Sequence, residues 1–534
     1  MSQTRHPGGL YLLFTTEMAE RFSYYGMRTI LVLYLVSAFF GQKEASQWYG
    51  SYTGLVYLTP LLGGYLADKL LGLRRSIVLG GVIMAIGQFL MFASACTVRQ
   101  SIFSAGGQMD PSVDNTLSFT FLLLGLLSIV IGNGFFKPCA STMVGGLYPQ
   151  GDSRVERGYT IFYSGINLGA FFAPLVCGYL ARSGGWADPS AYKWGFFCAG
   201  VAMIVALICF IAGKNRLLVG PDGEPLGTAP APKVASASGA VRKGGSPVRA
   251  VAFILAGAAL LALFSRGAEN VNDYISAAVF SASIVLPVMI ITDRGLTRGE
   301  KMRIGVIYII AVFAVVFWGA YEQAGSSLTL IGDRQCDRHI GSWEMPTAWL
   351  QSINPIVVVL FTPVMNAIWG WLSRRGKEPS APTKQAWGLV LLSVGFVIIA
   401  WGSRHLGEGQ LLSMWWIWGL YFVHSIAELC LSPIGLSMVN KLSPARFASL
   451  MMGVWFMSSA VSNVLAGELA TLLPVPGEAP SALLGFEIAT LSDFFTVFAV
   501  MGGVAGVILF TLCRILNRMA EAEERSTKPS PVTL

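Results

Sequence analysis

Charged residues are scarce in this sequence. They make up 12% of its 534 residues, whereas about 25% is usual for a soluble domain. Hydrophobic residues make up 54%, and the mean hydropathy is +0.60. This balance excludes an ordinary soluble protein and predicts a polytopic membrane protein.

Histidine and cysteine are few as well, with four and eight residues. The histidines show no HExxH or other metal-ligand spacing, so we expect no metal site. Only Cys336 lies clearly in a loop, so we expect no disulfide framework. No cleavable signal peptide is apparent, because the first apolar stretch carries charges. A nucleophile constellation and a sizeable extramembrane domain are also missing, which argues against a membrane-embedded enzyme or receptor.

Apolar windows long enough to cross a bilayer as helices recur along the whole chain. Fourteen can be drawn, near residues 10–40, 48–71, 74–96, 118–146, 157–182, 192–213, 249–266, 272–292, 302–332, 347–373, 384–403, 411–440, 447–473 and 488–513. The fold class expected from them is an all-α bundle of fourteen transmembrane helices.

Lysine and arginine are distributed unevenly over this pattern. If the N-terminus is cytoplasmic, most of the 37 Lys and Arg fall in inner loops and tails. This bias fits the positive-inside rule and predicts a multi-pass protein of the inner membrane with both termini in the cytoplasm. The net charge of +8 then reflects membrane topology, and we expect no nucleic-acid partner.

The spans divide into two groups of six with an insertion between them. Residues 372–377 form a basic loop that weakly repeats the loop at 63–75, which holds Asp68, and this is consistent with two related halves. Residues 214–248 are rich in Gly, Ala, Pro and Ser and predict a flexible linker. The expected units are a six-helix bundle (1–213), a cytoplasmic linker with two inserted helices (214–301), a second six-helix bundle (302–516) and a disordered tail (517–534).

A polar stripe runs along the first span. Glu17, Glu20, Arg21, Tyr24 and Arg28 share one helix face at this spacing. Four unpaired charges inside a membrane would cost about 10 kcal/mol. The stripe therefore needs partners from other spans.

Candidate partners lie in both halves of the chain, at Lys137, Glu322 and Glu428. One such residue could be a structural ion pair. Several of both signs on several helices indicate a substrate or proton pathway. The amides of Asn167 and Asn354 fit a clamp between helices as well as a ligand contact.

These residues resemble a known family. The pattern Glu17-x-x-Glu20-Arg21-Phe22-x-Tyr24-Tyr25-Gly26-x-Arg28 resembles the first-helix motif of the proton-dependent oligopeptide transporters, a branch of the major facilitator superfamily. Residues 162–169 resemble the fifth-helix motif of that family, and 63–75 resemble the loop motif of the superfamily. The resemblance implies the major facilitator fold, with two helices inserted between the halves. Cys139 departs from it, because many members have Asn there.

The resemblance also implies roles for individual residues. Arg21 would bind the substrate carboxylate, Glu428 the free amine, and Asn167 and Asn354 the peptide backbone or termini, while Tyr25, Tyr57 and Trp455 would line the pocket. Glu17, Glu20, Lys137 and Glu322 would serve proton coupling, and Arg28 would form a gating bridge to Glu322. For Asp68 we expect gating from its position beside Arg74 and Arg75 at the membrane surface, independently of the resemblance.

A physical argument supports this assignment. A dipeptide is a zwitterion, so a dry site needs a cation and an anion, and a guanidinium offers a two-pronged donor to a carboxylate. Protonation of Glu17 or Glu20 is expected to release Arg21 or Lys137 from an ion pair, which would free Arg21 for the peptide.

The function expected is therefore import of di- and tripeptides with protons by alternating access, without a chemical reaction. We expect no cofactor besides protons as the coupling ion, and a monomer in contact with membrane lipid. A transporter of the same fold for nitrate or an amino-acid conjugate remains the alternative.

Overall fold

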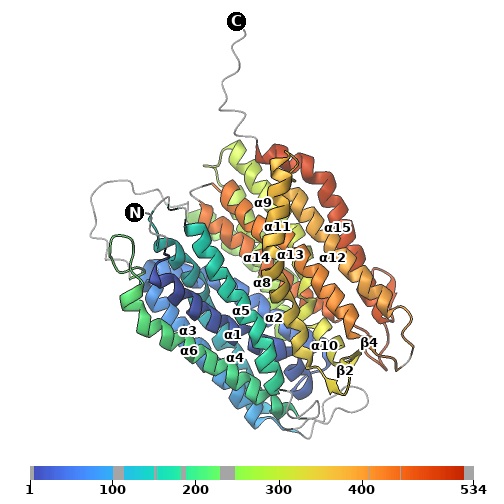
Figure 1. The fold of residues 1–534 in the computed structure, drawn as a ribbon. Coiled ribbons are helices and arrows are strands. Elements are labelled where there is room, and N and C mark those ends of the chain that lie inside the picture. Colours follow the sequence, from blue (N-terminus) through green and yellow to red (C-terminus); the bar gives the residue numbers. More distant parts are fainter. Residues whose placement is uncertain are drawn as a thin grey trace.

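The computed structural model describes residues 5–99, 113–149, 152, 154–181, 188–228, 247–407, 409–444 and 447–521. Fourteen helices of 18 residues or more make up most of these residues, and Figure 1 shows them as one bundle. Eleven stretches among them are long and apolar enough to cross a membrane. The expected all-α fold with fourteen long helices is confirmed.

The first half of the bundle holds six long helices. They are α1 (Gly8–Ala38), α2 (Gln42–Leu66), α3 (Leu73–Thr97), α4 (Thr116–Gly146), α5 (Val155–Ala181) and α6 (Lys193–Leu217), with a π-helical turn (Ala67–Leu71) after α2 and a 3-10 turn (Pro189–Tyr192) before α6. Glycines set the closest approaches: a Cβ on Gly80 would lie 2.5 Å from the Gly132 carbonyl oxygen. Small residues therefore bring α3 and α4 into backbone contact.

The second half also holds six long helices, the first of which is broken. They are α9 (Arg298–Tyr321), α11 (Ile353–Arg374), α12 (Ala381–Ser403), α13 (Met414–Leu442), α14 (Ala448–Ala470) and α15 (Leu491–Ala520). A 3-10 turn, η4 (Glu322–Gly325), separates α9 from the short α10 (Ser327–Arg334), and a second one, η5 (Thr347–Ser352), leads into α11.

Three pairs of short strands lie at one end of this half. Strand β1 (Cys336–Asp337) pairs in parallel with β4 (Leu412–Ser413), β2 (His339–Ile340) pairs antiparallel with β3 (Trp343–Glu344), and β5 (Ser481–Leu483) pairs antiparallel with β6 (Phe486–Ile488). Figure 1 shows β2, β4 and α10 at the end of the bundle opposite the C-terminus. We call this the distal end, and the end where α1 begins and α15 finishes the terminal end.

The two inserted helices, α7 (Pro247–Phe264) and α8 (Val271–Ile291), form a hairpin. Arg249 ties its ends together, since Nη2 donates to the Met289 carbonyl (2.6 Å) and Nη1 lies 3.3 Å from Asp293 Oδ2. Helix α8 packs against α14 and α2, and the Tyr308 hydroxyl of α9 donates to the Pro287 carbonyl (3.0 Å). The insertion thus contacts both halves.

The stretch expected as a flexible linker is folded in its first part. Helix α6 continues to Leu217, and residues 218–228 turn back on themselves with a bridge between Val219 and Pro225. Arg74 holds this hairpin: Nε donates to the Leu226 carbonyl (2.5 Å) and Nη2 to the Leu218 carbonyl. Composition suggested flexibility here, but buried Leu218 anchors the segment. Residues 229–246 lie outside the described residues.

The first residues of the predicted tail are helical. Helix α15 continues to Ala520, and Asn517 Nδ2 donates to Ser380 Oγ at 3.1 Å. Residues 522–534 lie outside the described residues. The boundaries of the four units stay predictions.

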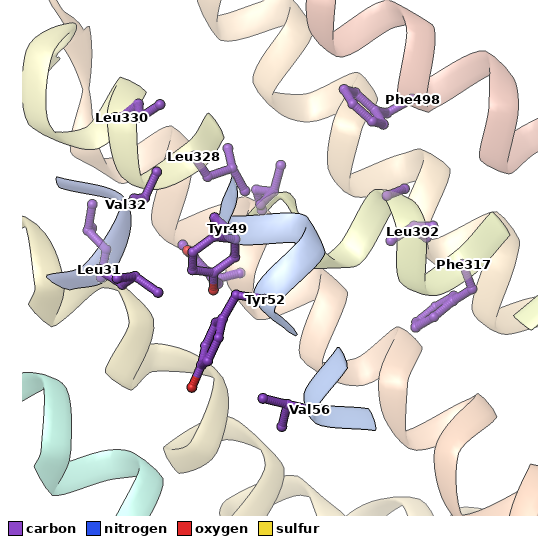
Figure 2. Packing of buried hydrophobic residues seen from close by; sticks show 14 of the residues in the cluster. Leu31, Val32, Tyr49, Tyr52, Val56, Phe317, Leu328, Leu330, Leu392 and Phe498 are labelled. Carbon is purple, nitrogen blue, oxygen red and sulfur yellow. The ribbon is translucent and has the colours of Figure 1, made fainter. Parts of the chain in front are cut away.

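A shared hydrophobic core joins the two halves toward the distal end. Figure 2 shows part of it, with Leu31 and Val32 of α1 and Tyr49 of α2 in the same cluster as Leu328 and Leu330 of α10. Helices α2 and α14 also touch directly across the halves: a Cβ on Gly50 would lie 2.7 Å from Gly467 Cα. The distal end is therefore closed.

Candidate functional site

The polar stripe of α1 is buried as one charge cluster. Arg21 Nε donates to Glu17 Oε1 at 2.9 Å and lies 3.2 Å from Glu20 Oε2. All three side chains are buried. Gly169 lets α5 approach them, because a Cβ there would lie 3.0 Å from Arg21 Cβ. The sequence spacing thus produces the expected grouping of one cation with two carboxylates.

Lys137 does not join this cluster through an ion pair. Within the described part of the chain, Lys137 Nζ makes no contact of 4 Å or less with a carboxylate, and instead lies 3.9 Å from the centroid of the Tyr57 ring. Glu20, which is fully buried, interacts with Lys137 only over a longer distance. Of the two ion pairs expected, this structure contains the one with Arg21 and lacks the one with Lys137. A cation above an aromatic face is stabilised by the ring quadrupole, which accounts for the position of the lysine.

A second charge pair joins the halves. Arg28 of α1 forms the expected ion pair with Glu322 of η4, and its Nε donates to the Tyr49 hydroxyl at 2.7 Å. The break after α9 places Glu322 here, and Gly325 makes room, since a Cβ on it would lie 1.8 Å from the Tyr49 hydroxyl. The pair links α1, α2 and η4.

A polar cluster in the second half surrounds Glu428 of α13. Its Oε2 accepts hydrogen bonds from the Tyr321 hydroxyl (2.7 Å) and from Asn354 Nδ2 (2.8 Å), and Asn354 Nδ2 also lies 3.1 Å from Ser425 Oγ. In this state Asn354 clamps α11 to α13. Glu428 Oε1 makes no hydrogen bond to the described residues.

The remaining candidate residues are more isolated. Asn167 donates to the Tyr163 carbonyl of its own helix (3.0 Å), and Tyr25 makes an edge contact with Tyr24. Trp455 is buried against Gly435 of α13, where an added Cβ would lie 2.3 Å from the indole. The backbone of Asp68 lies in the π-helical turn, and its side chain is outside the described residues.

The structure adds residues that the sequence alone did not single out. The Tyr49 hydroxyl accepts a hydrogen bond from Arg28, and the Tyr321 hydroxyl donates one to Glu428. Ser425 Oγ accepts a hydrogen bond from Asn354. Tyrosines in apolar spans usually pack, so their spacing gave no signal, although Tyr321 directly precedes Glu322. Asn133 is fully buried one turn before Lys137, and neither amide atom has a partner among the described residues.

The arrangement places opposite charges in opposite halves. Arg21 lies in α1, whereas Glu428 lies in α13 with one carboxylate oxygen free of described partners. A ligand with a carboxylate and an amine could contact both and so bridge the halves.

Comparisons with known proteins agree with this arrangement. The model of the POT family matches residues 74–483. Peptide transporter YePEPT of Yersinia enterocolitica is 33% identical over 476 residues, which cover 86% of this chain and 87% of that protein. Dipeptide and tripeptide permease A of Proteus mirabilis is 29% identical over 524 residues, which cover 97% and 96%.

Solved structures of similar proteins have the same fold. A crystal structure of peptide transporter POT in complex with sulfate has a TM-score of 0.76 at 28% identity and covers 97% of both chains. A POT family transporter in complex with 5-aminolevulinic acid has a TM-score of 0.74 at 27% identity and covers 96% of this chain and 98% of that one. The matches to the family and to the Yersinia transporter extend over most of the chain. This protein therefore belongs to the POT family, the proton-dependent oligopeptide transporters of the major facilitator superfamily.

Proposed function

We propose that this protein imports di- and tripeptides together with protons by alternating access. One observation carries the proposal: Arg21 and Glu428 are charges of opposite sign on helices of opposite halves. A peptide zwitterion matches this pair, whereas a simple anion such as nitrate would use only Arg21. The names of the relatives, peptide transporter and dipeptide and tripeptide permease, support the same substrate class.

Peptide binding exchanges the present partners of these two residues. The peptide carboxylate takes the guanidinium of Arg21 from Glu17 and Glu20, and the peptide amine binds the open oxygen of Glu428. Tyr321 and Asn354 hold the other oxygen of Glu428 in place meanwhile. Asn167, Tyr25, Tyr57 and Trp455 contact the rest of the peptide.

Proton coupling follows from competition for Arg21. Protonation of Glu17 or Glu20 removes the negative charge that holds the guanidinium, so the arginine becomes available to the substrate. Lys137 has no close carboxylate in this state. After the proton leaves, its ammonium pairs with the deprotonated Glu17 or Glu20. The membrane potential adds about 2.3 kcal/mol per 100 mV for each proton that enters.

The orientation in the membrane completes the mechanism. We assign the terminal end to the cytoplasm, in accordance with its lysines and arginines, and the distal end to the outside of the inner membrane. The structure then represents a state closed to the outside, in which Arg28 and Glu322 join the halves. We expect the protein to work as a monomer surrounded by lipid.

Uptake by proteoliposomes tests the proposal. Labelled dialanine should accumulate when the outside is acidic and should stop accumulating when a protonophore removes the gradient. Glu20→Gln should retain exchange of internal for external peptide but lose uphill uptake. Failure of unlabelled dipeptides to compete, or uptake that ignores the gradient, would overturn the proposal.

A second substrate class has one observation in its favour. The structurally similar POT family transporter was solved with 5-aminolevulinic acid, a small molecule with an amine and a carboxylate. The same assay with 5-aminolevulinic acid and with nitrate as competitors distinguishes the classes. If 5-aminolevulinic acid competes with the labelled substrate and unlabelled dipeptides do not, the transporter takes amino-acid-like substrates.

A further inference from the structure

The 3-10 turn η5 of the second half is attached to α5 of the first half. Ser352 Oγ donates to the Phe171 carbonyl at 2.9 Å, and Trp349 Nε1 donates to the Leu175 carbonyl at 3.0 Å. Ala348 fits against Gly178, where an added Cβ would lie 2.3 Å from Ala348 Cβ. We call this contact the α5–η5 seam.

The seam follows one face of α5. Its residues on that helix, 171, 175 and 178, are spaced four and three apart and therefore lie on the same side. Pro174 lies among them. The carbonyl that loses its helical donor to this proline is that of residue 170, so the seam bonds to residues 171 and 175 do not depend on it.

Both sides of the seam lead directly to proposed substrate residues. Phe171 follows Asn167 by four residues, which is about 6 Å along a helix. Ser352 precedes Asn354 by two residues, where η5 passes into α11. The hydrogen bond of Ser352 thus fixes the register of α11 against α5, and with it the distance between the two amides.

The seam differs in chemistry from the ion pair of Arg28 and Glu322, which also joins the halves. The bond between Arg28 and Glu322 is an attraction between two charged side chains. The seam consists of a hydroxyl, an indole N–H and backbone carbonyls, none of which titrates in the range of transport. The charged groups next to η5 are Asp333, which accepts a hydrogen bond from Thr347 Oγ1 (2.5 Å), and its partner Arg338. They bind at the first residue of η5 and not at the seam bonds of Ser352 and Trp349, whose contribution should not change with pH.

We propose that Ser352 and Trp349 are positioning residues for peptide binding, which anchor η5 to the α5 backbone and so set the spacing between Asn167 and Asn354 across the two halves. This inference rests on the proposed function for the role of the amides. The anchoring itself does not, because it concerns only the closed distal end. The two residues touch no substrate and act through the helices they join.

Transport kinetics test the positioning role. Ser352→Ala should raise the KM for dialanine about three- to tenfold, the range that follows from the loss of one hydrogen bond, with the maximal rate changed less than twofold. The factor by which the KM rises should be equal at pH 6 and pH 8, because the seam has no titratable group. Ser352→Thr keeps the hydroxyl and should restore the KM.

A matched control is available within the second half. Ser393 Oγ donates to the Ala499 carbonyl at 2.6 Å, which joins α12 to α15 without crossing the halves. Ser393→Ala removes the same kind of bond and should leave the KM unchanged. An unchanged KM in Ser352→Ala, an equal rise in Ser393→Ala, or a factor that varies with pH would each overturn the proposal.

A measurement without substrate separates this inference from the proposed function. Spin labels at Thr97→Cys and His339→Cys report the opening of the distal end, in a Cys96→Ser background that removes the exposed thiol. The combined Ser352→Ala and Trp349→Phe changes should add a population of longer distances that is absent in the parent and in Ser393→Ala. Unchanged distances would refute the anchoring, whatever the protein transports.

Discussion

Arg28 of α1 and Glu322 of η4 form a buried ion pair across the two halves, and Arg28 also donates to the Tyr49 hydroxyl at 2.7 Å. Three elements from both halves thus meet at one guanidinium. Removal of one partner of a buried ion pair typically costs about 3 to 5 kcal/mol, because the other charge stays behind without compensation.

Glu322→Gln should therefore open the distal end and abolish uphill uptake. A protein with both Arg28→Gln and Glu322→Gln leaves no unpaired charge and should be more thermally stable than either single variant. Thermal unfolding of the three proteins in detergent checks this. If the loss of thermal stability in the double variant equals the sum of the losses in the single variants, the two residues are not energetically coupled.

Tyr321→Phe should weaken peptide binding, because its hydroxyl donates to Glu428 Oε2. A hydrogen bond to a charged group contributes about 1.5 to 3 kcal/mol, so the KM for dialanine should rise at least tenfold. Tyr308→Phe is the control, since that hydroxyl donates to the Pro287 carbonyl of the insertion (3.0 Å). A comparable rise in KM for both variants would show that the effect is a general one of lost hydroxyls.

Cys336 should resist alkylation at pH 8. Burial raises the pKa of its thiol to about 12, so almost none of it is thiolate at that pH. The thiolate is the reactive form, so the rate should increase as the pH rises toward the pKa. Mass spectrometry after N-ethylmaleimide treatment should find exposed Cys96 modified and Cys336 intact. Rapid labelling of Cys336 at pH 8 would contradict its burial.

Arg74→Gln should release the hairpin at 218–228, because the guanidinium donates to two of its carbonyls. Limited proteolysis should then cut this segment at a protease concentration that spares the parent protein. Arg75→Gln is the matched control, because Arg75 is exposed. Equal cleavage of both variants would mean that positive charge in this loop, and not the hydrogen bonds of Arg74, protects the hairpin.

The sequence predicted most of the fold, since a bilayer forces apolar helices of a defined length. Helical periodicity also predicted the grouping of Glu17, Glu20 and Arg21. The position of Lys137 could not be predicted, because a long side chain can reach either a carboxylate or the Tyr57 ring.

Two further features could not be predicted from the sequence, for different physical reasons. The folded hairpin after α6 has the composition of a linker, but two of its carbonyls are held by Arg74, far away in the sequence. The α5–η5 seam uses backbone carbonyls as acceptors, and every residue has one. Sequence patterns do not mark which carbonyls are used.

The glycine contact between α2 and α14 has a mechanical consequence. A Cβ on Gly467 would lie 2.8 Å from the Ser46 carbonyl oxygen, so the helices meet backbone against backbone. Such a contact has no side-chain rotamers that must change when the halves tilt. The two helices can therefore separate and meet again without a side-chain rearrangement as the distal end opens and closes.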